Sequence, residues 1–403
     1  MKIESAPAPA QVRGFRFSGI HGGIKKKGRR DFALIVADRP CAGAAVFTRN
    51  RCAAAPVVVA REHASSGRIQ AIMINSGNAN CATGEQGLKL ARWSCEEVAG
   101  RLGIAPSLVL PCSTGVIGVQ LDHRVMAKAI SLGVDALSRR GFAAAARAIL
   151  TSDAFPKWAS RTLRLNDHEV TVAAMAKGAG MIEPHMATML SFVLTDAKLS
   201  PDAARSVLES AVATSLNRIS VDGDTSTNDT CVLMASGESA GAMIDGPASE
   251  GYETLARAVA EILDEVSRMI VRDGEGATKM VDLVVVGALD DGEADRVARR
   301  IANSPLVRTA LTGADPNWGR IVMALGNSEA SLEMAALEVD VGEVALVRAG
   351  TVISEEAVAA ARRVMKRDAY AMTVRLGAGP GRATIVTSDL TEAYVRLNSA
   401  YTS

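Results

Sequence analysis

The most informative part of the sequence is KGAGMIEPHMATML, which runs from residue 177 to residue 190. Strand-like segments at 169–174 and 189–194 flank it, so it predicts a connection between two β-strands. Gly178 and Gly180 within it permit backbone conformations that are closed to other residues. Such a connection can hold one peptide bond under strain.

A hydroxyl stands at the end of this connection. Ala187 precedes Thr188, so the threonine hydroxyl could attack the Ala187 carbonyl in an N-to-O acyl shift, and water would then cleave the ester. The freed α-amine of Thr188, with a pKa of about 7.7–8.0, would act as the base for its own hydroxyl. The sequence offers no convincing Ser-His-Asp set that would supply another nucleophile. The plain alternative is an ordinary glycine-rich turn, in which His185 is a surface or structural histidine.

Composition and charge narrow the class of protein. Hydrophobic residues make up 48% and charged residues 22% of the 403, ordinary shares that exclude a disordered or collagen-like chain. A net charge of +1 and an aromatic content of 3% argue against a nucleic-acid partner. The basic run KKKGRR at 25–30 is interpreted as an exposed charged turn rather than a phosphate or nucleic-acid site. The length favours two closely packed domains.

No segment predicts a metal site or a membrane partner. The six cysteines form no Cys-x-x-Cys pair and stand at no zinc spacing with the histidines, so we expect reduced, mostly buried thiols. Residues 1–15 lack the apolar core of a signal peptide, and the apolar runs are too short to span a bilayer. These features predict a cytoplasmic protein.

Local patterns predict both strands and helices. Ser200 followed by proline is typical of a helix start, apolar residues at helical spacing predict a helix over 253–271, and Ser354 opens a further helix. Strands are expected over 32–36, 57–59, 72–74, 108–110, 169–174, 189–194 and 283–286. The segments 75–80 and 111–115 are expected to be turn-rich loops after their strands. Because strands and helices do not alternate regularly, the expected class is α+β.

The stretch at 177–190 resembles the nucleophile block of the glutamate N-acetyltransferase / ornithine acetyltransferase family of arginine biosynthesis. The resemblance covers essentially the whole chain and continues, in order, in blocks at 23–25 with 31–35, 75–80, 113–118, 221–229, 272–279, 315–320 and 389–391 with 394–395. It implies a layered α+β sandwich of sheets covered by helices, like DmpA and ornithine acetyltransferase, with a smaller C-terminal lobe from about residue 280.

The resemblance also implies an activity. Family members cleave themselves between the residues that match Ala187 and Thr188, which would give an α chain of 1–187 and a β chain of 188–403. Thr188 would accept acetyl from N2-acetylornithine and pass it to glutamate in ping-pong order. Some members also use acetyl-CoA as a donor. The resemblance implies no metal or cofactor. It also implies that two α chains and two β chains form a heterotetramer.

Site residues carry over by position. Thr114 and Gly115 match the oxyanion hole, and the substrate contacts match Thr151, Lys177, Thr188, Glu275, Asn398 and Ser403. A lysine suits a substrate carboxylate, and Glu275 suits the ornithine ammonium. The chain departs from the family pattern at His185, where asparagine is usual, at the Cys81-Ala82 order, at Ser388 in place of cysteine, and at Ser403 in place of threonine.

Two other functions remain open. A self-processing aminopeptidase would use the same type of N-terminal nucleophile but resolve the acyl-enzyme with water. A non-enzymatic assembly or binding protein would undergo cleavage only as maturation. Replacement of Thr188 separates an enzyme from such a protein.

Overall fold

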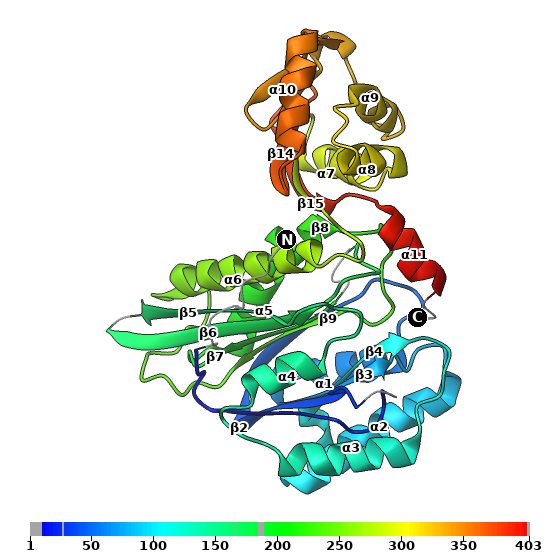
Figure 1. Ribbon diagram of the computed structural model, residues 1–403. Coiled ribbons are helices and arrows are strands. Elements are labelled where there is room, and N and C mark those ends of the chain that lie inside the picture. The colour runs from blue at the N-terminus through cyan, green and yellow to red at the C-terminus, as the bar shows by residue number, and fades with distance from the viewer. Residues whose placement is uncertain (1–9, 26–27, 166, 184–188, 401–403) are drawn as a thin grey trace. The chain divides into compact units, whose positions relative to one another are not determined.

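The computed structural model describes residues 10–25, 28–165, 167–183 and 189–400. Contacts divide them into two compact units (Figure 1). The N-terminal unit contains 10–217 and 224–270, and the C-terminal unit contains 218–223 and 271–400. The second unit therefore includes a short segment from the middle of the chain.

The N-terminal unit is built on one mixed sheet. In the described part of the chain its strand order is β4-β3-β2-β9-β7-β6-β5, and β1 pairs with β2. The strands are β1 (Phe15–Ile20), β2 (Phe32–Phe47), β3 (Arg68–Asn78), β4 (Val109–Val116), β5 (Lys157–Leu165), β6 (His168–Lys177), β7 (Leu190–Thr195) and β9 (Thr230–Ala235). The strands expected at 32–36, 72–74 and 169–174 are confirmed, and the one expected at 189–194 is confirmed with its start one residue later.

Alternating side chains of β2 pack into two separate hydrophobic cores. Ile35 joins a cluster that contains side chains of β3 and β4 together with those of β6, β7 and β9, so the two halves of the sheet face a shared core. Leu34, on the other face, joins a cluster that includes side chains of α2 (Gly84–Leu102) and α3 (His123–Asp135). Figure 1 shows α5 (Pro201–Thr214) and α6 (Tyr252–Arg272) over the half that contains β5 and β6. The two halves of this one sheet therefore form the two inner layers of the unit, and helices form the two outer layers.

Local signals explain most helix boundaries. Ser200 caps α5 by accepting from the backbone N–H of Ala203, and α6 covers the helix expected at 253–271. The strand predicted at 57–59 is wrong: these valines belong to α1 (Ala55–Ala64), which has Pro56 in its first turn. A short apolar run cannot distinguish a buried strand from one buried turn of helix. The unit also contains α4 (Phe142–Ala148) and the short 3-10 helix Pro106–Leu108.

The two expected loops after β3 and β4 are largely strand. β3 continues to Asn78 and β4 to Val116, because the two strands pair in parallel register as far as Gly77 opposite Gly115. This correction matters for function, since it places the predicted oxyanion residues on a strand end that a neighbouring strand holds in place.

The C-terminal unit has its own sheet, in the order β13-β12-β11-β14-β10-β15-β8 among the described residues. Its strands are β8 (Ile219–Ser220), β10 (Met280–Ala288), β11 (Glu338–Val341), β12 (Val344–Arg348), β13 (Thr351–Val352), β14 (Ala369–Arg375) and β15 (Gly381–Ser388). Its helices are α7 (Asp291–Ala302), α8 (Pro305–Thr312), α9 (Trp318–Gly326), α10 (Glu355–Met365), α11 (Glu392–Ala400) and the 3-10 turn Met334–Ala336. A further 3-10 turn, Leu216–Arg218, directly precedes β8 in the chain. Ser354 caps α10 as predicted, and alternate residues of β10 enter a separate core.

The expected fold class, an α+β layered sandwich with a smaller C-terminal lobe, is confirmed. All six cysteines are free, and Cys52 alone among them is exposed. Within the residues that the structure describes, every helix is too short or too polar to span a lipid bilayer.

Candidate active site

The ends of β3 and β4 form the floor of the candidate site. Gly115 has a φ of +133°, and a Cβ built on it would lie 2.3 Å from the carbonyl carbon of Gly77, so only glycine fits there. The Asn228 side chain donates to the carbonyls of Ser113, at 2.9 Å, and Ala79, at 2.7 Å. These contacts hold the Thr114–Gly115 backbone in a fixed place, as an oxyanion site requires.

Lys177 reaches this floor from the end of β6. Its ammonium donates a hydrogen bond of 3.1 Å to the hydroxyl oxygen of Thr114, and both residues are buried. A hydroxyl that accepts one hydrogen bond still has its own proton to donate. The predicted carboxylate anchor and the predicted oxyanion donor are therefore in direct contact.

Asp153 holds Thr151 beside the end of β6. Asp153 is a buried carboxylate that the sequence did not single out. Its Oδ2 accepts from the Thr151 backbone N–H at 2.8 Å, and its Oδ1 accepts from the Gly178 N–H and the Lys157 ammonium, both at 2.7 Å. Burial alone would raise the pKa of Asp153, but the Lys157 and Lys177 ammoniums hold that pKa well below its usual range. Asp153 therefore links Thr151 to the start of the glycine-rich connection.

A second buried carboxyl, that of Asp229, has a pKa shifted in the opposite direction to that of Asp153. Burial raises the pKa of Asp229 well above its ordinary value, and the Ser226 hydroxyl, the Lys177 charge and the Met189 backbone N–H oppose this shift without reversing it. Its Oδ2 has no hydrogen-bond partner among the described residues. A carboxyl whose protonated form is favoured by burial therefore faces the backbone of Met189, the residue that follows Thr188 in the sequence.

The glycine-rich connection is described only as far as Glu183. Gly178, one of the two glycines expected to need an unusual backbone, has a φ of +158°, and the non-glycine residue Met181 has a φ of +57°. Ile182 forms a bridge with Thr225, whose hydroxyl donates to the Glu183 carbonyl at 2.8 Å. Ala187 and Thr188, the predicted cleavage position and nucleophile, and His185 lie outside the described residues.

In the C-terminal unit two predicted substrate contacts meet each other. Asn398, on α11, donates to the carboxylate of Glu275 at 3.0 Å. The Thr391 hydroxyl donates to the Gly276 carbonyl at 2.7 Å, which ties the start of α11 to the Glu275 segment. Ser403 lies outside the described residues.

Sequence reasoning missed several residues of the site. Asp153 accepts from the backbone N–H two residues before it, an arrangement that no local sequence signal predicts. Asn228 and Asp229 stand in a block that carried the family resemblance but received no role. Lys25 is half-buried, so the interpretation of its basic run as an exposed turn is wrong at that position.

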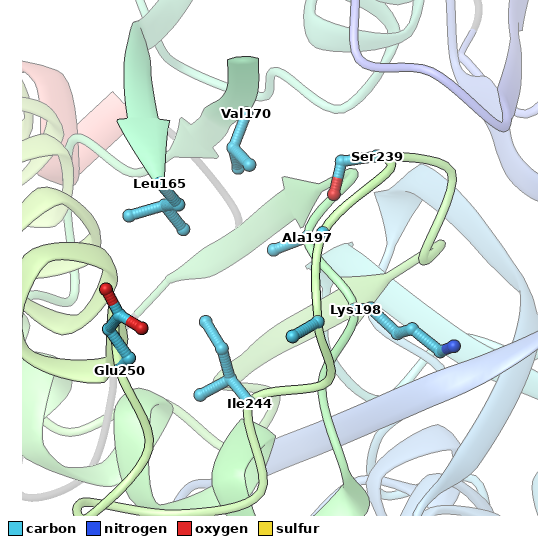
Figure 2. A pocket seen from close by; sticks show the side chains of 9 residues that line it. Leu165, Val170, Ala197, Lys198, Ser239, Ile244 and Glu250 are labelled. Atoms are coloured by element: carbon cyan, nitrogen blue, oxygen red, sulfur yellow. The ribbon is translucent and has the colours of Figure 1, made fainter. Parts of the chain in front are cut away.

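A separate hollow of the N-terminal unit contains none of the predicted site residues (Figure 2). Its cavity of ≈ 20 Å³ holds about one water molecule, which is too little for an amino-acid substrate. It is lined by Leu165, Val170, Ala197, Lys198, Ser239, Gly241, Ala242, Ile244 and Glu250. The hollow therefore does not compete with the strand ends as a candidate site.

Comparison with known proteins gives a consistent family. Residues 16–403 match the model of the ArgJ family. The arginine biosynthesis bifunctional protein ArgJ of Geobacter sulfurreducens is 45% identical over 390 residues, covering 97% of this chain and 99% of that protein. Its namesake from Methylococcus capsulatus is 46% identical over 391 residues, covering 97% and 95%. A crystal structure of argJ from Bacillus halodurans is 36% identical, with a TM-score of 0.51, and covers 53% of this chain and all of that one. The chain belongs to the ArgJ family.

Proposed function

We propose that this protein transfers the acetyl group of N2-acetylornithine to glutamate through an acetyl-Thr188 intermediate, releasing ornithine and N-acetylglutamate. The observation that carries this proposal is the contact between Lys177 and Thr114, which joins a cation for the substrate carboxylate to a donor for the reacting carbonyl. The names of the relatives, which are arginine biosynthesis proteins of nearly the same length, support the same assignment.

The chemistry runs in two matched half-reactions. The Thr188 hydroxyl attacks the acetyl carbonyl, and the resulting oxyanion is stabilised by the Thr114 hydroxyl and the Gly115 N–H. Because the Thr114 oxygen already accepts from Lys177, its proton is directed to the oxyanion. Collapse expels ornithine, and the amine of glutamate then attacks the acetyl ester in the reverse sense.

The nucleophile arises by self-cleavage between Ala187 and Thr188, giving chains of 1–187 and 188–403. The freed α-amine serves as the general base. A Lys177 charge close to that amine favours its neutral form. Two copies of each chain assemble into a heterotetramer.

Binding uses groups of opposite charge. Lys177 binds the substrate carboxylate, Thr151 and Ser403 contribute hydroxyls, and Glu275 with Asn398 binds the ornithine ammonium. No cofactor takes part, because acyl transfer between hydroxyl and amine needs none. The relatives are called bifunctional, which supports acetyl-CoA as a second acetyl donor. The six free cysteines, five of them buried, support action in the cytoplasm.

The test combines mass spectrometry with an acetyl-transfer assay. Wild-type protein is expected to give two chains that begin at Met1 and Thr188 and to form N-acetylglutamate from N2-acetylornithine and glutamate. Thr188→Ala is expected to remain one chain without activity. Full transfer activity in uncleaved Thr188→Ala protein rejects the proposal, and rapid hydrolysis of peptide amides without glutamate favours the aminopeptidase instead. Glutamate with acetyl-CoA alone tests the second donor.

A further inference from the structure

The side chain of Lys25 lies between the strand ends and Thr151. Its stem crosses Gly77, where a built Cβ would meet the Lys25 Cγ at 2.8 Å, and Gly77 is the residue that pairs with Gly115. The Lys25 ammonium donates to the carbonyl of Leu150, the residue before Thr151, and to that of Arg30 at 3.0 Å. Lys25 therefore borders the two predicted elements of the site.

The loop that carries Lys25 is fixed from within. The buried carboxylate of Asp31 accepts from the backbone N–H groups of Gly22, at 2.5 Å, Gly23, at 3.2 Å, and Lys25, at 2.9 Å. Three such bonds to one carboxylate organise a tight loop, so the position of the Lys25 stem is set before any substrate arrives.

Within the described residues, no carboxylate contacts the Lys25 ammonium directly. Both hydrogen bonds of its ammonium go to neutral carbonyls, and its third N–H has no hydrogen-bond partner among the described residues. Burial, followed by the Arg29 charge, lowers the pKa of Lys25 to about 8; Lys177 acts in the same direction, and Asp31 and Asp153 oppose it. Two partly desolvated ammoniums that destabilise each other form a site for added negative charge.

We infer that Lys25 and Lys177 together recognise an acceptor with two carboxylates, Lys177 binding the α-carboxylate that both substrates share and Lys25 binding the second. This inference rests on the proposed function. Glutamate carries two carboxylates and N2-acetylornithine carries one, so Lys25 acts in the second half-reaction and sets acceptor specificity. A charge-assisted hydrogen bond of this kind changes kcat/KM by about 10- to 100-fold.

The test measures each half-reaction in Lys25→Met. We expect kcat/KM for glutamate to fall by about 10- to 100-fold, while ornithine release from N2-acetylornithine changes by less than about 3-fold. In Lys25→Met, kcat/KM for glutamine, which lacks the second charge, is expected to approach that for glutamate. Lys25→Arg is expected to restore glutamate use. Lys25→Gln, which keeps N–H donors for the two carbonyls, serves if the methionine variant fails to fold.

Lys279→Met is the matched control, because the Lys279 ammonium also donates to two backbone carbonyls, those of Lys366 and Arg367, each at 3.1 Å. An equal loss for both substrates, or unchanged glutamate kinetics, overturns the inference about Lys25. Absence of glutamate-dependent turnover in the wild type instead rejects the proposed function, so the two failures are distinguishable.

Discussion

Lys177 and Thr114 are in direct contact, with the Lys177 ammonium 3.1 Å from the Thr114 hydroxyl oxygen, although the two residues stand 63 positions apart in the chain. One comes from the end of β6 and the other from the end of β4. The contact makes the carboxylate anchor and the oxyanion donor a single unit, because a change in the lysine alters where the threonine proton points.

Replacing Thr114 is expected to slow the chemical step. Thr114→Ala removes one of the two oxyanion donors, which lowers kcat by a factor on the order of 10²–10³. Steady-state kinetics check this, with Thr114→Ser as the control that keeps the hydroxyl. Unchanged turnover in Thr114→Ala would remove this residue from the oxyanion site.

Lys177 and Thr114 are expected to be coupled energetically. Lys177→Met disturbs both substrate binding and the Thr114 proton, so the double variant should lose less activity than the sum of the two single losses. The coupling free energy is expected to be on the order of 1 kcal/mol, the range of residues in contact. A double-mutant cycle on kcat/KM measures it, and strict additivity contradicts the shared role.

Local sequence patterns predicted the elements whose signals are local. The Ser200 cap, the Ser354 cap and the apolar strand at 72–74 each depend on a few neighbouring residues, and the structure confirms them. The run at 57–59 failed because three valines fit either a strand or a helical turn, and only tertiary packing decides between them.

The candidate site could be predicted from the sequence only in part. The family resemblance assigned roles to Thr114, Thr151 and Lys177, and the fold brings them together where β4 and β6 end. Asp153 and Asp229 escaped notice because a carboxyl acquires its character from burial and from partners far along the chain, such as Gly178 for Asp153. A charge run likewise does not reveal which of its lysines turns inward.

Asp153 is expected to be essential for folding stability. Asp153→Asn leaves the fully buried ammonium of Lys157 without its carboxylate, which costs about 3–5 kcal/mol. Urea unfolding measures the loss, and Lys157→Met in the same background should recover part of it because the buried ammonium that lost this carboxylate is then removed. A loss below about 1 kcal/mol would contradict an ionised, paired Asp153.

The other buried carboxyl, Asp229, is expected to respond in the opposite way. Its pKa is raised in the folded protein, so the stability that it contributes is fully present below the unfolded pKa of about 3.9 and is lost as pH rises toward the folded pKa. Asp229→Asn removes this dependence. The free energy of unfolding of the variant should therefore rise relative to wild type as pH rises above about 4, and a difference that stays constant would show an ionised Asp229.

Use of glutamate is expected to depend on pH through Lys25. The lysine must be charged to bind a second carboxylate, and burial lowers its pKa to about 8, with Arg29 and Lys177 acting in the same direction and Asp31 and Asp153 against it. An arginine at this position stays charged at every working pH. The ratio of kcat/KM for glutamate between wild type and Lys25→Arg should therefore fall as pH rises from about 7 to about 9. The comparison cancels titration of the glutamate amine and of the Thr188 amine, which both enzymes share. A ratio that does not change with pH would mean that the charge of Lys25 plays no part in binding the acceptor.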